Sequence, residues 1–484
     1  MTVCFSKASA RRSLLVSFGE RYTLLLFGVA GTMIIARILP PSEIGIFSIG
    51  AVLVGLAQVL RDFGVGQYVV ASKTLTPDQL RAVLGVSVCS AWTLAGLVAL
   101  LSGMTADFYD EPRLRDVMRL LALNFVLLPF TALTLSYLRR QLRVSGIYII
   151  NTTHSLVQLV STVWLAACGY GCLSLAWGTV AAAVAGLLVS LPLRPADLPW
   201  RPSLQGARAV IGFGFYATGG NLVDEAGVAA PDLIIGKLLD AEAVATFGKA
   251  QALLNLFSQA VTSAVSPVIL PMFARQARDG QDFRTSYLLT VSCMTAVAWP
   301  FFALLGTLAL PTVNFVYGPQ WDGAAPLIRI MCCSSALYSM FIMARYLFIA
   351  TGHVREQARL DTLSVAFRVA LLLPAALFGL YWVALAVAGS VVIRSWLTWG
   401  YLSRLAEINA ADLLRAVRQS AALTLLTTLA PIGALFMMKS GPVQLMVASI
   451  CAVSLWLVGV VIFRHPLAEE LELAWRKVAR RNAT

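Results

Sequence analysis

Seven basic side chains lie within long apolar runs of the sequence, where a charged group is costly. A cation at the centre of a bilayer costs at least about 2.5 kcal/mol, so cations kept there normally face a wet cavity or a partner. Arg329 and Arg345 lie near the ends of one run, from which long side chains reach the interface. The other five are candidates to bind an anion from a cavity wall: Arg21, Arg61, Lys249, Arg368 and Arg394. The alternative for each is a buried ion pair.

Three acids gather in one apolar run near the middle of the chain, namely Asp224, Glu225 and Asp232. Pro231 precedes the third acid and removes a helical hydrogen bond, which could free a backbone carbonyl. Such a set is suited to binding a coupling ion, either a proton or sodium. Two alternatives remain: the acids pair with Arg21 or Lys249, or Asp232 lies at the periplasmic surface.

Arg61 and Asp62 are followed closely by two glycines, Gly64 and Gly66. Glycine weakens a helix, so this step predicts a break in the helix beside the cavity. The alternative is a self-contained structural ion pair near the cytoplasmic end of the span.

The elements that must hold these groups are membrane-spanning helices. Of 484 residues, 58% are hydrophobic and 13% are charged, and the mean hydropathy is +0.78, which excludes an ordinary soluble domain. About 20 apolar residues cross a bilayer as one helix. Fourteen runs qualify: 13–38, 43–72, 79–103, 113–138, 146–168, 171–193, 208–236, 241–274, 284–310, 325–350, 357–379, 381–403, 415–438 and 442–463.

The other basic residues, which lie between the runs or close to their ends, are strongly asymmetric. One face collects 24 Lys and Arg and the other only 6, so the positive-inside rule places both termini in the cytoplasm. Orientation therefore explains most of the net charge of +13, and no nucleic-acid partner is implied. Beyond the last span, residues 464–484 have the spacing of an amphipathic helix on the cytoplasmic surface.

Signatures of catalysis are missing from the sequence. The eight cysteines lack metal-ligand spacing, the three histidines are isolated, and there is no nucleophilic triad or Walker loop. We therefore expect no enzyme, no metal and no cofactor other than a coupling proton or sodium ion.

The sequence contains an internal repeat at an offset of 200 residues. Arg37 falls on Lys237, and apolar residues such as Ile34 and Phe47 fall on Ile234 and Phe247. Transporters are often built from two related halves. We expect lobes of six spans at 1–194 and 208–404, a cytoplasmic linker at 195–207, two further spans within 405–463, and the tail at 464–484.

Five segments together resemble polysaccharide flippases of the Wzx type, in the MOP exporter superfamily. They are ARILPPSEIGIF at 36–47, RDFGVG at 61–66, PDLIIGKLL at 231–239, Pro267 and Pro271 before FAR at 273–275, and FVYGPQW at 315–321. The resemblance implies an all-α integral membrane protein with about 14 transmembrane helices, arranged as two six-helix lobes in a V plus two C-terminal helices. Family members carry cavity cations on spans 1, 2 and 8, to which Arg21, Arg61 and Lys249 correspond.

The function implied is alternating-access flipping of undecaprenyl-diphosphate-linked repeat units of exopolysaccharide, capsule or O-antigen across the bacterial inner membrane. Expected partners are this lipid-linked oligosaccharide, membrane lipid, and a polysaccharide polymerase with its export machinery. The alternatives are a cation-coupled multidrug antiporter or a peptidoglycan lipid flippase of the same superfamily. A membrane glycosyltransferase or ligase is a weaker alternative, because the longest predicted outer loop has only about a dozen residues.

Overall fold

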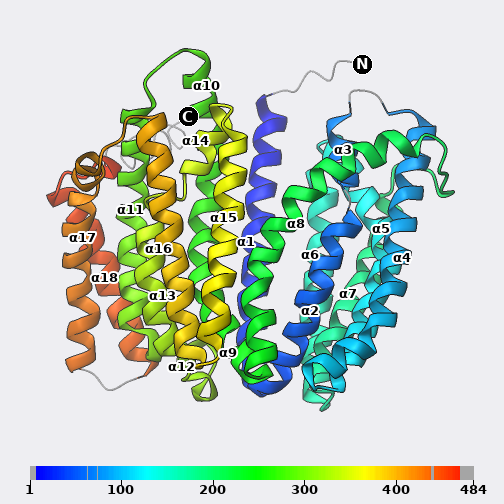
Figure 1. The fold of residues 1–484 in the computed structure, drawn as a ribbon, viewed down its shortest axis with the longest axis horizontal. Coiled ribbons are helices and arrows are strands. Elements are labelled where there is room, and N and C mark those ends of the chain that lie inside the picture. The colour runs from blue at the N-terminus through cyan, green and yellow to red at the C-terminus, as the bar shows by residue number, and fades with distance from the viewer. Residues whose placement is uncertain (1–6, 63, 73–74, 438–440, 469–484) are drawn as a thin grey trace. The chain divides into compact units, whose positions relative to one another are not determined.

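The computed structural model describes residues 7–62, 64–72, 75–437 and 441–468. All regular secondary structure in these ranges is helical, which confirms the predicted all-α fold (Figure 1). Ten helical stretches of the described residues are long and apolar enough to cross a membrane, and they lie at ten of the fourteen predicted spans. Helices also lie at the other four predicted spans: α6 (Val144–Ala167), α8 (Ala207–Leu238), α13 (Ala324–Tyr338) and α15 (Val354–Ala376). Of these, α13 is apolar but has only 15 residues. The chain is a multi-pass membrane protein.

Contacts between residues divide the chain into two compact units, Met1–Ala245 and Thr246–Thr484. Besides α6 and α8, the first unit contains α1 (Lys7–Ile38), α2 (Pro41–Asp62), α3 (Val65–Ala71), α4 (Pro77–Tyr109), α5 (Arg113–Arg140) and α7 (Cys172–Leu193). Helix α5 is central, since it packs against α2, α3, α4 and α7. Its Leu133 joins Val83 and Leu84 of α4 in a buried apolar cluster.

Glu43 links three connections at one end of the first unit. Its Oε1 lies 2.6 Å from Nη1 of Arg113, at the start of α5. Its Oε2 accepts a 2.7 Å hydrogen bond from the backbone N–H of Cys172, the first residue of α7. A carboxylate at a helix N-terminus also interacts favourably with the helix dipole. Lys237 of α8 holds the same α4–α5 connection by donating to the carbonyl of Phe108 at 2.5 Å.

The predicted linker at 195–207 packs against the first unit. Leu198 is buried in the apolar cluster of α4, and the N–H of Ser203 donates to the carbonyl of Arg81 at 3.1 Å. At Gly85, a Cβ atom would lie 2.2 Å from the Ser203 carbonyl oxygen, so only glycine permits this approach. The Arg194 guanidinium lies 4.0 Å from the centroid of the Trp200 ring. The predicted lobe boundaries at 194 and 208 remain predictions.

The second unit is also helical, and α9 begins just before it. Besides α13 and α15 it contains α9 (Ala241–Phe257), a π-helical turn (Ser258–Thr262), α10 (Ser263–Arg278), α11 (Phe283–Thr307), α12 (Ala309–Val316), α14 (Ala344–Ala350), α16 (Leu380–Leu405), α17 (Ala410–Met437) and α18 (Pro442–Ile462). Helix α11 packs against α13 and α17, and α16 packs against α13 and α15. The predicted surface helix falls largely on residues 469–484, which lie outside the described part of the chain.

Within the described residues, three spans are interrupted. Between α2 and α3, Gly64 adopts a left-handed conformation with φ 62°, which confirms the predicted break. The π-helical turn separates α9 from α10. The predicted span 325–350 is divided by a turn at 339–343, where the buried Tyr287 hydroxyl donates to the Met340 carbonyl at 3.1 Å. This bond satisfies a carbonyl that the broken helix leaves without its normal partner.

His465, just after α18, is buried in a polar network. Its Nδ1 accepts the N–H of Leu467 at 3.1 Å, so Nε2 carries the proton of the neutral ring. Nε2 lies 3.2 Å from the hydroxyls of both Ser292 on α11 and Ser420 on α17. Burial lowers the pKa of His465. The neutral ring thus ties the end of α18 to two other helices.

Candidate functional site

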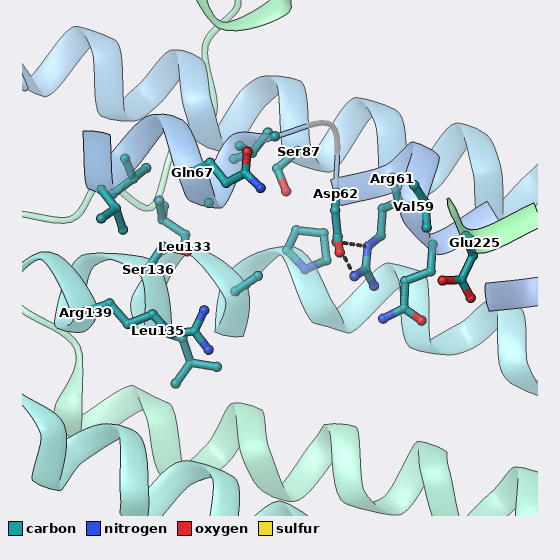
Figure 2. Close-up of a pocket in the computed structure, with 18 of the residues that line it drawn as sticks. Val59, Arg61, Asp62, Gln67, Ser87, Leu133, Leu135, Ser136, Arg139 and Glu225 are labelled. Carbon is teal, nitrogen blue, oxygen red and sulfur yellow. Dashed lines mark hydrogen bonds and ion pairs between the residues drawn. The ribbon is translucent and has the colours of Figure 1, made fainter. Parts of the chain in front are cut away.

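A cavity of about 1020 Å³ lies in the first unit, beside the interruption between α2 and α3. Residues of α2, α3, α4, α5 and α8 line it, and Gly64 and Gly66 form part of its wall. Figure 2 shows Arg61 and Asp62 near the centre of the view, with Arg139 and Glu225 toward opposite sides. The helix break therefore lies in the wall of a polar cavity, as the sequence predicts.

Arg61 is only 6% exposed and lines this cavity. Its Nε donates to Oδ1 of Asp62 at 3.0 Å, and Nη2 donates to the same oxygen. Its guanidinium carbon lies 5.4 Å from the centroid of the Phe125 ring. Nη1 has no hydrogen-bond partner in the described part of the chain. The predicted pair with Asp62 is present, and it leaves the Nη1 amino group of the guanidinium without a partner in the described part of the chain.

Arg139, near the end of α5, also lines the cavity, although the sequence reading assigned it only to membrane orientation. Its exposed side chain makes no ion pair with any residue whose position is described. Ser136 lies one turn earlier on the same face, and its hydroxyl oxygen would be 3.0 Å from a Cβ atom on Gly66. The signal in the sequence was this spacing of Ala132, Ser136 and Arg139, which places all three toward α3.

Two of the predicted acids line the same cavity, and the third does not. Asp224 and Glu225 lie in its wall, and Oε1 of Glu225 would be 3.7 Å from a Cβ atom on Gly55. Asp232 lies about two turns further along α8 and is half-buried outside the lining. Helix α8 continues through Pro231 without ending. The described lining thus combines two arginines with three acids, a mixed set in which Asp62 balances Arg61.

Arg21, on α1 of the first unit, is half-buried and does not line this cavity. Its neighbour Glu20 accepts a 2.7 Å hydrogen bond from Nδ2 of Asn151 on α6. Glu20 therefore has a partner on another helix. The structure brings together Arg61, Asp224 and Glu225 from the predicted set, and leaves Arg21 and Asp232 apart from them within the first unit.

The other predicted cations belong to the second unit. Lys249 on α9 is 9% exposed, and its Nζ lies 5.1 Å from the Tyr317 ring centroid and 5.2 Å from that of Trp321. Such cation–π contacts stabilise a charge while leaving its hydrogen bonds free for another group. Arg368 on α15 is half-buried and lies two helical turns after Asp361.

Arg394 on α16 forms a mostly buried ion pair, close to the alternative considered for it above. Its Nη2 lies 2.7 Å from Oδ1 of Asp361 on α15. Oδ2 of Asp361 accepts a 2.8 Å hydrogen bond from Nε2 of Gln357. The guanidinium carbon also lies 5.3 Å from the Tyr338 ring centroid, at the end of α13. Arg394 thus joins α13, α15 and α16.

The described residues contain no group of three or more His, Cys, Asp or Glu side chains that could hold a metal ion. The cavity of the first unit can offer N–H donors to an anion and carboxylates to a cation. Its chemistry is that of binding rather than of covalent catalysis.

Several known proteins are similar to this chain in sequence or fold. The lipopolysaccharide biosynthesis protein WzxC of Escherichia coli K12 is 23% identical over 73% of this chain and 71% of its own length. The succinoglycan biosynthesis transport protein ExoT of Rhizobium meliloti 1021 is 22% identical over 63% of this chain and 62% of its own length. The lipid II flippase MurJ, solved in an inward closed conformation, superimposes with a TM-score of 0.75 at 13% identity. That alignment covers 94% of this chain and 99% of MurJ.

These findings confirm the resemblance to Wzx-type flippases and the fold of the MOP superfamily. A family model described as "polysaccharide biosynthesis protein" matches residues 34–326, which is more than half of the chain. The protein belongs to this polysaccharide biosynthesis family.

Proposed function

We propose that this protein is a flippase that moves polyprenyl-diphosphate-linked polysaccharide repeat units across the bacterial inner membrane by alternating access. The family match and the polar cavity of the first unit support this proposal together. The cargo is undecaprenyl diphosphate carrying an oligosaccharide of exopolysaccharide, capsule or O-antigen. A polysaccharide polymerase and the export machinery act on it afterwards, and both termini of the flippase are cytoplasmic.

The observation that carries the proposal is a pair of arginines in one cavity within a membrane bundle, Arg61 and Arg139. A diphosphate cannot cross bare hydrocarbon, so its passage requires a hydrated pocket with charge-assisted donors. Arg139 has no ionic partner within the described residues, and Arg61 keeps Nη1 unused. Lys249, Arg21 and Arg368 remain proposed phosphate contacts. Arg394 is a weaker candidate because Asp361 already neutralises it.

Asp224 and Glu225 are proposed to bind the coupling ion, a proton or sodium, because they share the cavity with the arginines. Binding of a cation there would offset their charge when the anionic cargo enters. Asp232 lies outside the cavity lining and is a less direct candidate.

Export of surface polysaccharide from a deletion strain that carries plasmid-borne variants tests the proposal. Arg139→Glu should abolish export, whereas Arg139→Lys should retain part of it because a point charge still attracts phosphate. Arg355→Glu is the matched control, since Arg355 is exposed on α15 of the second unit. The amount of each variant in the membrane is measured in parallel. Normal export of polysaccharide by the variants Arg139→Glu and Arg61→Gln would refute the proposed cationic site.

A cation-coupled multidrug antiporter is the second candidate, and the three acids of the cavity favour it. In that case deletion should raise drug sensitivity and leave the surface polysaccharide unchanged. Loss of polysaccharide with unchanged drug sensitivity supports the flippase. A lethal deletion that stops cell-wall synthesis would point to a peptidoglycan lipid flippase instead.

A further inference from the structure

Helices α4 and α5 are neighbours in the first unit (Figure 1). A second cavity, of about 420 Å³, lies at the surface between them. Small residues of α4 form its floor: Ala95, Gly96 and Ala99. A Cβ atom on Gly96 would meet nothing within 4 Å, so the space above it is open. Trp92 is 52% exposed at one end, where its indole N–H lies 3.4 Å from the carbonyl of Val126. The cavity is therefore a shallow apolar groove that one side chain, Arg119, makes polar.

Arg119 is exposed and forms no hydrogen bond or ion pair with any side chain that the structure describes. It lies six residues after the first residue of α5, about 9 Å into the span at 1.5 Å per residue. Long side chains of a helix point toward its N-terminus, so the guanidinium is directed to the nearer membrane surface. Arg119 is therefore available to bind an anion from outside the protein near the surface end of the span.

A second arginine lies beyond the groove, toward the start of α5. Arg115 lies one turn before Arg119 on the same face of α5, and its Nε would be 3.7 Å from a Cβ atom on Gly103 of α4. Its own acidic neighbour, Asp107, is 4.0 Å away, and the Asp107 side chain is 80% exposed. Like charges one turn apart repel, so an anion held between the two arginines would stabilise both. The cations thus lie at the surface end and the apolar floor lies deeper in the span.

We propose that this groove binds an anionic phospholipid, with its phosphate on Arg119 and Arg115 and one acyl chain lying over Gly96 as far as Trp92. Charge and depth both match this occupant, because a phospholipid carries its anion at the surface and its chain beneath it. The site is separate from the cavity that contains Arg61 and does not depend on the cargo proposed above.

Native mass spectrometry of the full-length protein, purified in detergent and stripped of lipid, tests the proposal. Dioleoyl-phosphatidylglycerol and dioleoyl-phosphatidylcholine are added at equal concentrations, with glycerol phosphate as a probe without acyl chains. We expect one phosphatidylglycerol to bind preferentially. Arg119→Gln should reduce its binding by about tenfold or more, because it removes a charge-assisted hydrogen bond. Gly96→Leu, which fills open space, should reduce the binding while Arg119 is intact.

Arg355→Gln is the control, since it removes an exposed arginine of the second unit and should leave binding unchanged. Equal binding of the two lipids, or an unaltered preference in Arg119→Gln, would overturn the proposal. Equally strong binding of glycerol phosphate would show a phosphate site without a lipid groove. Displacement of phosphatidylglycerol by undecaprenyl phosphate at equal concentration would assign the groove to a prenyl lipid instead.

Discussion

Replacing Glu43 by alanine removes the carboxylate that links three connections of the first unit. The hydrogen bond to the Cys172 N–H resembles a helix cap, and losing such a bond costs about 1–2 kcal/mol. The ion pair with Arg113 adds about 0–1 kcal/mol, because the Arg113 side chain is 51% exposed and water screens it. The expected loss is about 2 kcal/mol, which corresponds to a fall of about 4–8 °C in the unfolding midpoint of a domain of this size.

Tryptophan fluorescence during heating in detergent measures this fall, with all variants scanned at the same rate because unfolding of such proteins is often irreversible. Glu43→Gln should lose less stability, since its amide oxygen still accepts from Cys172. Asp78→Ala is the control, because Asp78 forms only an exposed pair with Arg81. Hydrogen exchange at Cys172 should rise in Glu43→Ala and stay low in the control. Unchanged exchange there, or equal midpoints for the two alanine variants, would refute the reasoning.

Three further predictions concern packing and charge. Gly178→Ala should destabilise the protein by about 1–3 kcal/mol, because its Cβ atom would lie 1.9 Å from Oγ1 of Thr162. Thermal unfolding measures this loss. Gly28→Ala is the control and should be much milder, because nothing lies within 4 Å of the added Cβ atom. Asp361→Ala should cost about 3 kcal/mol, because it leaves the Arg394 side chain, which is only 22% exposed, without its ionic partner. Gel filtration should then show a smaller folded fraction, and an unchanged fraction would mean that the pair is dispensable. Burial lowers the pKa of His465 in the folded protein. The neutral ring therefore stabilises the fold above the pKa of the unfolded chain, about 6.5, and this stabilisation is lost as the pH falls below that pKa. Unfolding midpoints from pH 8 to 5.5 should therefore fall more steeply for the wild type than for His465→Asn, and parallel curves would contradict this assignment.

The sequence predicted the helical architecture well because the bilayer imposes long apolar runs on any spanning helix. It also located the helix break at Gly64, since glycine is a helix-weakening residue that can be recognised in the sequence. The break at 339–343 had no such mark: the residues from Ser339 to Met343 include neither glycine nor proline. That turn depends on a tertiary hydrogen bond from Tyr287, which no local pattern reveals.

Charged residues of the candidate site were predicted less completely. Finding cations inside apolar runs identified Arg61, but it gave no information on partners from distant helices. Arg394 was therefore proposed for phosphate although Asp361, 33 residues away in sequence, neutralises it. Arg139 was overlooked for the opposite reason, because a cluster of arginines at the end of a span is fully explained by orientation. Only the cavity in the folded unit shows that one of them faces inward.

The attachment of residues 195–207 to α4 changes how the middle of the chain should be handled in the laboratory. A polar, proline-containing connection is a common choice for inserting affinity tags, fluorescent reporters or protease sites. Here the backbone of Ser203 lies against Gly85 and Leu198 is buried, so an insertion next to either residue would displace part of the helical packing. Of this connection, Gln205 is exposed and its side chain takes no part in these contacts, which makes it the better position for a label.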